Sequence, residues 1–399
     1  MRKRRNLWII VLLSFIFNGG NVFAQQDPRV SSRAALLMEL QSGQILWSKE
    51  LDKIQPPASI TKLMTYHLVM DAVEVGKIAL EDRVIISEMA AGERGTRYNL
   101  EAGETVSLEK LIEAMMIVSG NDAAFAIGEY VEGSKAAFVK RMNEEAQRLG
   151  MKDTYFVNPH GLPESGKENM SSARDVAILS KYLIERYEKH LLEVTAMENF
   201  EDPQREIYRK NTNNLLKVLP GVDGLKTGFT NAAGFCLVST LGIEPEKEGE
   251  ESFRLIAVVL GAPNDQQRVA DSKNILEYGK QNFTRQKVFG AGDVVERIYL
   301  WNMADLELGL TLEQDLSLFG PKTGIIKKQD IQMSEDISFP LKAGDKVGEL
   351  RLTLYDDQEL HVDLISDRTY NRLPIRARMT RWWWGFSGLL VGLLDRVLG

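Results

Sequence analysis

The sequence predicts an α+β protein in which one antiparallel sheet packs against helices and a small β-sandwich follows. Alternating apolar residues lie near both ends of the segment 1–285, at 33–53 and at 222–262, with helical periodicity between them. After residue 285, short apolar runs are separated by turn signals. A chain of 399 residues that is 44% hydrophobic and 26% charged is able to bury cores of this kind.

The N-terminal segment 1–24 predicts an export signal. A basic segment at 2–5 precedes an apolar run at 7–17, and residues 22–24 are interpreted as the cleavage site. The apolar run is too short to span a membrane comfortably. Removing residues 1–24 lowers the formal net charge from −7 to about −11. That acidity argues against nucleic acid as a partner.

The elements expected in residues 25–285 follow one order. A hairpin that turns at residues 41–43 comes first, then helices, then strands joined by an acidic tip, then a last helix. The expected ranges are 107–118 and 171–194 for helices, 222–243 and 253–262 for strands, 244–251 for the acidic tip and 269–283 for the last helix. Strands at both ends with helices between them predict a single domain.

The remaining chain divides into two further segments. Residues 286–375 have the turn spacing of a small β-sandwich or barrel-like module. Residues 376–399 combine arginines, three successive tryptophans and an apolar helical face. We expect this tail to form an amphipathic helix in a membrane interface, and a helix docked on the β-module is the alternative.

Cysteine and histidine give no sign of a disulfide or a metal site. Cys236 is the only cysteine, so no disulfide can form within one chain, and its apolar neighbours predict a buried strand residue. The four histidines lie far apart and match no metal-ligand spacing. We therefore expect no metal and no cofactor.

Two Ser-x-x-Lys motifs occur, and the first has the surroundings of a chemical site. Lys62 is the only charged residue between Lys53 and Asp71, and Pro57 places a helix start close to Ser59. Ser59 and Lys62 then share one helix face within hydrogen-bonding reach. Burial lowers the pKa of a lysine from about 10.4. A neutral Lys62 would act as the general base for a nucleophilic Ser59.

The second Ser-x-x-Lys motif is predicted to be structural. Lys110 lies among Glu104, Glu109 and Glu113, so it should remain solvated and cationic. Ser107 directly precedes an apolar-periodic run and is expected to cap that helix.

Lys-Thr-Gly also occurs twice, and the same reasoning separates the two copies. No charged residue follows Lys226 until Glu244, and the intervening pattern is that of a strand. Lys226 and Thr227 should therefore border the core beside a cleft. Lys322 lies in a turn bounded by proline and glycine, near Lys327, as expected of a solvated hairpin tip.

A third pattern is the segment 118–124, Val-Ser-Gly-Asn-Asp-Ala-Ala. The preceding helix should end near Gly120, which would leave Ser119 and Asn121 on an exposed bend. Taken alone, this pattern favours simple helix punctuation with an asparagine cap.

Together, Ser-x-x-Lys, Ser-x-Asn and Lys-Thr-Gly resemble the motif set of penicillin-binding proteins and class A β-lactamases. The chain resembles the low-molecular-mass penicillin-binding proteins that act as D-alanyl-D-alanine carboxypeptidases. Segment 339–350 resembles the C-terminal domain of that family, and the amphipathic tail its usual anchor. Further similar stretches are 56–65, 117–124, 158–162, 171–175, 222–230 and 258–268. The resemblance covers nearly the whole mature chain and implies a penicillin-binding protein/serine β-lactamase-like fold.

The resemblance implies a catalytic role for three residues. Ser59 would attack the carbonyl of the penultimate D-alanine and become an acyl-enzyme, while Lys62 takes its proton. Ser119 would relay a proton to the leaving D-alanine. The N–H of Ser59 and one from the strand after Gly228 would form the oxyanion hole.

The resemblance also implies how substrate is held. Asn121 would bind the peptide amide, and Lys226 would keep Lys62 neutral and help bind the substrate. Thr227 and Arg268 would face the terminal carboxylate.

Several positions depart from the family pattern or carry no catalytic prediction. Thr212 stands where some members have an arginine that precedes the Lys-Thr-Gly strand. Glu164 and Glu168 lack the Glu-x-x-Leu-Asn setting of a class A β-lactamase, so efficient β-lactam hydrolysis is not expected. His160 and Asp175 are interpreted as loop-shaping residues.

The expected function is a penicillin-sensitive serine carboxypeptidase on the outer face of the cytoplasmic membrane. Its partners would be peptidoglycan stem peptides ending in D-Ala-D-Ala, β-lactams as covalent inhibitors, and the membrane surface. An endopeptidase acting on peptidoglycan crosslinks would use the same motifs, although the β-module favours a carboxypeptidase. A β-lactamase and a non-catalytic penicillin-binding scaffold are two less favoured hypotheses, and the intact motifs argue against the scaffold.

Overall fold

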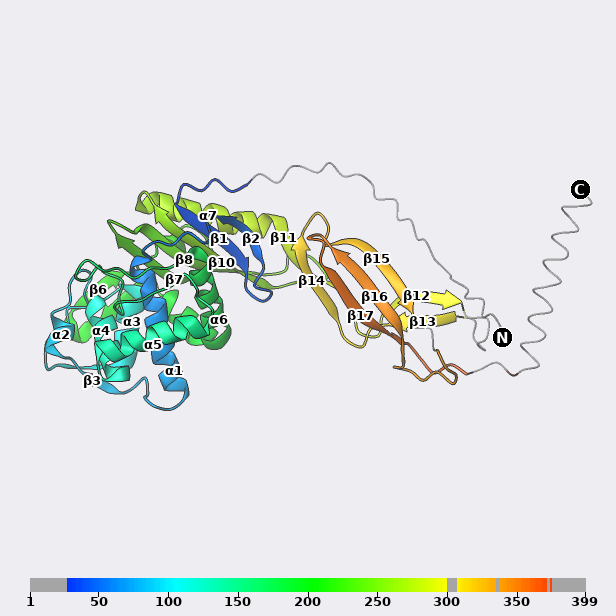
Figure 1. Ribbon diagram of the computed structural model, residues 1–399, viewed down its shortest axis with the longest axis horizontal. Coiled ribbons are helices and arrows are strands. Elements are labelled where there is room, and N and C mark those ends of the chain that lie inside the picture. The colour runs from blue at the N-terminus through cyan, green and yellow to red at the C-terminus, as the bar shows by residue number, and fades with distance from the viewer. Residues whose placement is uncertain (1–26, 300–306, 335–336, 372–373, 375–399) are drawn as a thin grey trace, which may run out of the picture.

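The protein is elongated, with the helices and the main sheet at one end and a β-rich part at the other (Figure 1). The computed structural model describes residues 27–299, 307–334, 337–371 and 374. The predicted signal at 1–24 and the predicted tail helix at 376–399 lie outside these residues. None of the helices in the described ranges has the length and apolar character needed to cross a membrane.

A five-stranded antiparallel sheet forms the centre of the first part, which confirms the predicted fold class. The predicted hairpin supplies its first two strands, and the Lys-Thr-Gly strand β7 lies at the opposite edge. In spatial order the strands are β2 (Ile45–Lys49), β1 (Ala34–Glu39), β10 (Phe253–Ala262), β8 (Gly234–Ile243) and β7 (Val222–Thr230). As an edge strand, β7 is free to present one side to a cleft.

Helices cover both faces of this sheet, so β1 is buried along its whole length. Leu36 and alternate strand residues pack against most of the helices, while Leu37 belongs to the second cluster, on the face covered by α7. The helices are α1 (Lys62–Glu74), α2 (Glu88–Ala91), α3 (Leu108–Ile117), α4 (Asn121–Glu132), α5 (Lys135–Arg148), α6 (Ala173–Thr195) and α7 (Asp265–Asn282).

The predicted helices occur close to their expected positions. Ser107 caps α3 by accepting a hydrogen bond from the Lys110 N–H, as predicted, and Ser172 caps α6. Helix α7 begins at Asp265, ahead of the expected start at 269, because Asn264 caps it. Short elements complete this part: η1 (Ala58–Thr61), η2 (Pro203–Arg205), η3 (Asn214–Lys217), β3 (Arg83–Ile85), β4 (Thr105–Ser107), β5 (Asn199–Asp202) and β6 (Ile207–Lys210).

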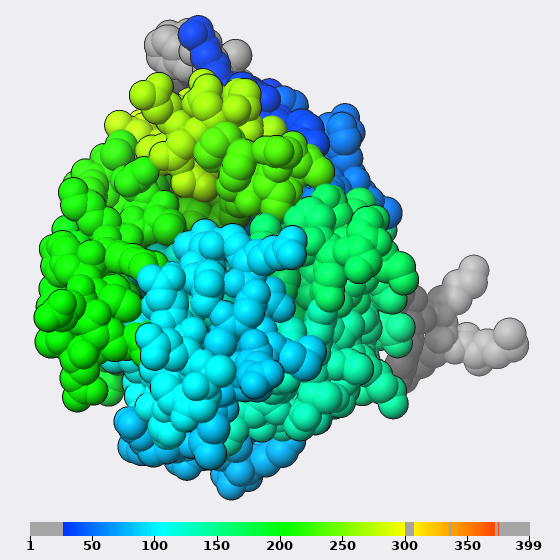
Figure 2. All heavy atoms as spheres, turned by 90° about the vertical axis from the view of Figure 1, so that its left-hand side faces the viewer, coloured from blue at the N-terminus to red at the C-terminus, as the bar shows by residue number. Residues whose placement is uncertain are grey.

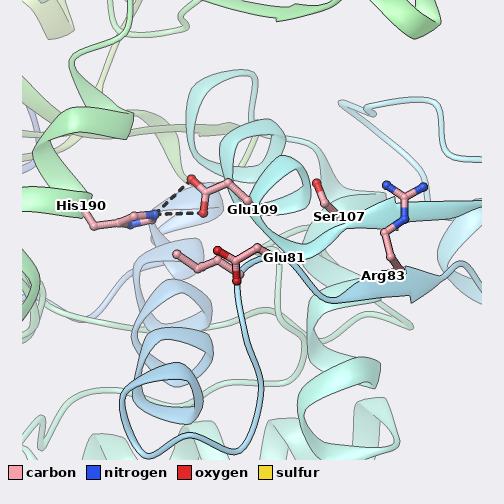
Figure 3. A pocket seen from close by; sticks show the side chains of 6 residues that line it. Glu81, Arg83, Ser107, Glu109 and His190 are labelled. Atoms are coloured by element: carbon pink, nitrogen blue, oxygen red, sulfur yellow. Dashed lines mark hydrogen bonds and ion pairs between the residues drawn. The ribbon is translucent and has the colours of Figure 1, made fainter.

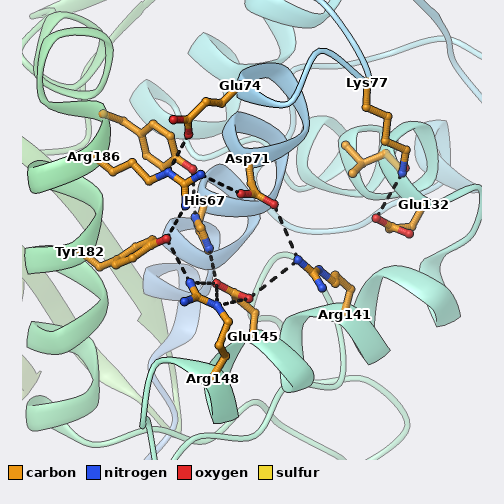
Figure 4. Close-up of polar contacts among 12 residues, drawn as sticks. His67, Asp71, Glu74, Lys77, Glu132, Arg141, Glu145, Arg148, Tyr182 and Arg186 are labelled. Atoms are coloured by element: carbon orange, nitrogen blue, oxygen red, sulfur yellow. Dashed lines mark hydrogen bonds and ion pairs between the residues drawn. The ribbon is translucent and has the colours of Figure 1, made fainter.

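A polar network joins α1 to α5 and α6 (Figure 4). The His67 Nε2 atom lies 2.6 Å from a carboxylate oxygen of Glu145, and both side chains are buried. Glu145 also accepts hydrogen bonds from Arg148, which contacts the Tyr182 hydroxyl on α6. These bonds fix the position of α1, whose first residue is Lys62.

The β-rich part forms a second sheet with its own hydrophobic core. Its strands in spatial order are β12 (Val294–Tyr299), β13 (Glu307–Thr311), β17 (Glu359–Ser366), β16 (Lys346–Leu354) and β15 (Ile326–Met333). Leu310, Leu350 and Leu364 are fully buried between its elements.

A three-stranded ladder connects the two parts. Strand β11 (Phe283–Phe289) pairs with β14 (Leu316–Pro321) on one side and with β9 (Glu250–Glu251) on the other. The sequence predicts a simple tip for the acidic segment, but β9 belongs to that segment and takes part in this ladder. Strand β11 also runs through residues 285 and 286, where the sequence predicts the domain boundary.

Candidate active site

The 3₁₀ turn η1 leads directly into α1 and places Ser59 against Lys62. The Lys62 Nζ atom lies 2.7 Å from the Ser59 hydroxyl oxygen. The same amine lies 2.7 Å from the Asn121 side-chain oxygen and 3.1 Å from the backbone oxygen of His160. The Lys62 side chain is fully buried, so these groups replace its water shell.

Burial is the largest influence on Lys62 and lowers its pKa, and the positive charge of Lys226 lowers it further. The carboxylates of Asp122 and Glu93 act in the opposite direction. The net result is a pKa well below the usual lysine value. A neutral amine next to a hydroxyl is able to accept its proton, which is the requirement for activating a serine.

Ser119 and Asn121 lie at the bend between α3 and α4, but the prediction that this bend is exposed is wrong. Only 7% of Ser119 and 2% of Asn121 is accessible to solvent. The segment that carries Arg94 and Thr96 covers the bend: the Asn121 N–H donates to Thr96 O at 2.8 Å, and its side-chain nitrogen donates to Arg94 O at 2.7 Å. Ser119 has a φ of 63° and holds its hydroxyl 3.4 Å from Lys62 Nζ.

Figure 2 shows this end of the molecule, where cyan segments near residue 100 meet green segments near residue 210. Arg209 donates a hydrogen bond to the backbone oxygen of Arg97 across this junction. The loop that carries Arg94 and Arg97 is thereby bonded to Asn121 on one side and to Arg209 on the other.

Strand β7 forms the opposite wall of the site. Lys226 and Thr227 are almost fully buried, and the Lys226 amine donates to the Thr227 carbonyl at 3.1 Å. Burial, together with the charge of Arg268, lowers the pKa of Lys226 to about 7. A Cβ at Gly228 would lie 2.9 Å from Pro57 O and 3.0 Å from the Ser59 nitrogen. Glycine therefore lets β7 approach the Ser59 backbone closely.

Arg268 lies in the first turns of α7, buried beside β8. It forms an ion pair with Asp265 and donates to Cys236 O at 3.3 Å and to Thr212 O at 3.5 Å. Burial lowers its pKa, and Asp265 raises it. Thr212 in turn shares a 2.7 Å hydrogen bond with the Thr227 hydroxyl. Arg268 is therefore connected to β7 through Thr212.

The structure brings the predicted site residues into one cluster with two halves. Lys62 bonds directly to Ser59, Ser119 and Asn121. Lys226 lies close enough for its charge to act on Lys62. Thr227 and Arg268 meet through Thr212.

Sequence reasoning missed the backbone oxygen of His160. This oxygen lies 3.1 Å from Lys62 Nζ and 3.3 Å from Ser59 Oγ, although the sequence predicts only a loop-shaping role for His160. Its ring does shape the loop, because Nδ1 accepts from the Leu162 N–H and Nε2 lies 3.4 Å from Glu93. Burial, opposed by Glu93, lowers the pKa of the His160 ring.

Asp122 and Asp175 hold backbone segments near the site. The Asp122 carboxylate accepts the N–H groups of Tyr98, Asn99 and Leu100. Asp175 accepts from the Asp153 N–H and the Thr154 hydroxyl, as expected of a loop-shaping residue.

The second copies of the two motifs lie elsewhere. Ser107 borders an open hollow of about 450 Å³ (Figure 3), at the N-terminal end of α3, whereas Ser119 follows the C-terminal end. In this hollow the His190 ring lies 3.2 Å from Glu109. Lys110 forms an ion pair with Glu113, and Lys322 is exposed in a turn after β14, as predicted. The other residues that line the hollow are Leu80, Glu81 and Arg83.

Within the described ranges, no group of three or more His, Cys, Asp or Glu side chains is placed to hold a metal ion. Cys236 is buried on β8, and burial raises the pKa of its thiol to about 11.

Comparison with known proteins identifies the family. Residues 21–264 match the family model described as D-alanyl-D-alanine carboxypeptidase. The chain belongs to this family. Residues 283–372 match the model of the penicillin-binding protein 5 C-terminal domain.

Individual relatives cover most of the chain. The D-alanyl-D-alanine carboxypeptidase DacF of Bacillus subtilis is 35% identical, over 86% of this chain and 87% of the relative. The crystal structure of penicillin binding protein 5 from Haemophilus influenzae has a TM-score of 0.67 and 30% identity, covering 87% of this chain and 99% of that one. The D-alanyl-D-alanine endopeptidase of Escherichia coli is 32% identical but covers only 53% of this chain and 67% of the relative.

Proposed function

We propose that this protein is a serine-type D-Ala-D-Ala carboxypeptidase that removes the terminal D-alanine from peptidoglycan stem pentapeptides through an acyl-enzyme. The observation that carries the proposal is the buried Lys62 amine, 2.7 Å from the Ser59 hydroxyl and with a strongly lowered pKa. A serine with such a base is an activated nucleophile. Family membership supplies the substrate class.

In the acylation step, Ser59 Oγ attacks the carbonyl carbon of the penultimate D-alanine while its proton passes to Lys62 Nζ. The oxyanion accepts hydrogen bonds from the N–H groups of Ser59 and Phe229, which follows Gly228 on β7. The proton then moves from Lys62 through Ser119, 3.4 Å away, to the leaving nitrogen. The C–N bond breaks and D-alanine departs. Water subsequently hydrolyses the ester and restores Ser59.

Asn121, Lys226, Thr227 and Arg268 hold the substrate in this scheme. The Asn121 side chain binds the peptide amide, and the positively charged Lys226 helps bind the substrate and keeps Lys62 neutral. Thr227 and Arg268 face the terminal carboxylate. A β-lactam carries a carboxylate in a similar position and acylates Ser59, with slow release. No metal or cofactor takes part in any of these steps.

The decisive experiment combines a labelled penicillin with a pentapeptide ending in D-Ala-D-Ala. We expect an adduct on Ser59, mapped by peptide mass, together with release of free D-alanine. The Ser59→Ala variant should lose both signals, whereas Ser107→Ala should keep both. Absence of an adduct would indicate a scaffold, and rapid penicillin turnover would indicate a β-lactamase.

An endopeptidase that cuts peptidoglycan crosslinks is the second candidate. The match to the penicillin-binding protein 5 C-terminal domain and the small share of the chain covered by the endopeptidase relative both favour the carboxypeptidase. If the protein cleaved a crosslinked muropeptide dimer faster than a pentapeptide, the endopeptidase would be the favoured function.

We also propose the organisation of the whole chain. Residues 1–24 are the signal, 25–285 the catalytic domain, 286–375 the β-rich domain and 376–399 an amphipathic membrane anchor. The enzyme then works on the outer, periplasmic or extracytoplasmic face of the cytoplasmic membrane. Flotation with anionic vesicles should retain the mature chain and lose a version that ends at residue 375. Equal flotation of both would contradict the anchor.

A further inference from the structure

Thr212 touches three walls of the candidate site at once. Its N–H and its hydroxyl both reach the backbone oxygen of Ile117 at the end of α3, at 3.2 Å and 3.3 Å. Its hydroxyl oxygen lies 2.7 Å from the Thr227 hydroxyl on β7. Its backbone oxygen accepts from Arg268 on α7 at 3.5 Å. Thr212 is only partly buried, so part of it is accessible to solvent.

The two hydroxyl groups form a directional chain in the substrate-free protein. Thr227 donates its proton to Thr212, and Thr212 donates its own proton to Ile117 O. Because a hydroxyl has a single O–H donor, Thr227 in this arrangement has none left for an anionic ligand. A carboxylate accepts hydrogen bonds and cannot donate them.

The backbone N–H of Thr212 allows this chain of hydrogen bonds to reverse without leaving the Ile117 carbonyl unpaired. This N–H already bonds to Ile117 O, so the carbonyl keeps a partner when the Thr212 hydroxyl turns away. The Thr212 hydroxyl is then free to donate to Thr227, and Thr227 to donate to a ligand. Hydroxyl rotation alone accomplishes this, with no covalent bond made or broken.

A hydroxyl donor matters here because the charge of Arg268 is partly offset. Its guanidinium already pairs with Asp265. Its buried Nε–H has no acceptor among the residues that the structure describes, which leaves one donor available. A partly neutralised cation and the Thr212–Thr227 pair are therefore neighbours, joined by the bond from Arg268 to Thr212 O.

We propose that Thr212 is a positioning residue that acts through Thr227: binding of the substrate carboxylate reverses the hydroxyl pair, so that Thr212 donates to Thr227 and Thr227 donates to the carboxylate. This inference rests on the proposed function, in which Thr227 faces the terminal carboxylate. It assigns Thr212 the task of orienting and polarising that hydroxyl.

The test compares Thr212→Val, which keeps the shape and removes the hydroxyl, with Thr212→Ser, which keeps the hydroxyl. The rate of Ser59 acylation is measured with benzylpenicillin and with its carboxyl methyl ester. We expect Thr212→Val to slow acylation by benzylpenicillin about tenfold, the effect of losing one hydrogen bond of ordinary strength. The ester lacks the anionic acceptor, so Thr212→Val should acylate with it at the same rate as the wild type does. Thr212→Ser should resemble the wild type with both compounds.

A double-mutant cycle shows whether Thr212 acts through Thr227. The variant with both Thr212→Val and Thr227→Val should be no slower than Thr227→Val alone, because the first hydroxyl has nothing left to orient. For the pentapeptide, the loss in Thr212→Val should fall on KM more than on kcat. Equal slowing of the penicillin and its ester, additive effects, or a wild-type rate in Thr212→Val would each overturn the relay. If the wild type itself forms no Ser59 adduct and releases no D-alanine, the proposed function fails instead.

Discussion

Gly161 packs directly against the backbone of Ala58: a Cβ at Gly161 would lie 1.9 Å from the Ala58 carbonyl oxygen. Both residues have positive φ, 93° and 49°. Ala58 precedes the proposed nucleophile Ser59, and Gly161 follows His160, whose carbonyl contacts Lys62. This contact therefore sets the spacing between the nucleophile and a carbonyl that holds its base.

Gly161→Ala should separate these two backbones. We expect acylation of Ser59 by labelled penicillin to fall at least tenfold and stability to fall by roughly 1–3 kcal/mol, as for other overpacked sites. Gly166→Ala is the matched control, because Gly166 has a φ of 77° and no atom within 4 Å of the added Cβ. Gly166→Ala should lose only the stability that a positive φ costs a non-glycine residue, about 1 kcal/mol, and it should be acylated normally. Normal acylation by Gly161→Ala would show that the spacing is not critical.

Lys62→Met should lower acylation by about 10³-fold, the usual contribution of a general base. Lys110→Met, in the second Ser-x-x-Lys motif, should have no effect. Because burial and Lys226 lower the pKa of Lys62, the wild-type acylation rate should reach its plateau well below pH 10.5. A rate that still rises through pH 10 would mean that this amine titrates like an exposed lysine.

Lys226→Met should abolish efficient turnover and yet stabilise the fold. With the Lys226 pKa lowered from 10.5 to about 7, the unfolded chain binds more protons between these pH values. The free energy of unfolding therefore rises with pH across this window, and the penalty for the buried cation is complete below about pH 7. The variant should gain on the order of 1–4 kcal/mol at pH 6.5 and progressively less toward pH 10.

Denaturant unfolding at pH 6.5 and pH 9.5 measures this difference. Lys322→Met, in the exposed Lys-Thr-Gly copy, should change stability little at either pH. A Lys226→Met variant no more stable than the wild type at pH 6.5 would contradict the assigned penalty.

Glu145→Gln should destabilise the protein by about 3 kcal/mol at pH 7, because it removes a buried carboxylate that contacts His67 and forms an ion pair with Arg148. Burial raises the pKa of Glu145, but hydrogen bonds from His67 and Arg148 outweigh it and lower that pKa to about 2. The stabilisation is present above pH 4.5 and is lost as the pH falls toward 2, so the difference between variant and wild type should shrink in acid.

The control for that variant is Glu144→Gln, which removes an exposed ion pair with Lys140 at the neighbouring position on α5. Exposed pairs of this kind contribute little, so thermal unfolding should shift by less than the equivalent of about 0.5 kcal/mol. Equal losses in the two variants would show that the His67 network does not fix α1.

Local charge was enough to predict which copy of each motif is buried. Lys62 lies in an apolar stretch and is fully buried, whereas Lys110 lies among glutamates and pairs with Glu113. Periodicity likewise predicted the hairpin, the helices near 108–117 and 173–195, and the sheet strands. These features are predictable because they are determined by residues that are close together in the sequence.

Features that depend on distant segments were not predictable in this way. Ser119 and Asn121 are buried because the earlier loop that carries Arg94 and Thr96 folds over them. The His160 contact uses a backbone oxygen, which carries no signature of residue type. The expected domain boundary falls inside β11 because that strand pairs with β9, on the far side of β10 and α7 in the sequence.

Strand β11 has consequences for the mechanics of the molecule, since its hydrogen bonds are shared between β9 and β14. An ion pair between Arg285 and buried Glu39 and a ring contact between Phe253 and Phe319 reinforce the same junction. Rotation of one part against the other would break hydrogen bonds of this ladder and expose apolar surface. The β-rich part is therefore held rigidly on the first part. The distance and the tilt between the Ser59 site and the far end of the β-rich part are therefore set by the fold itself.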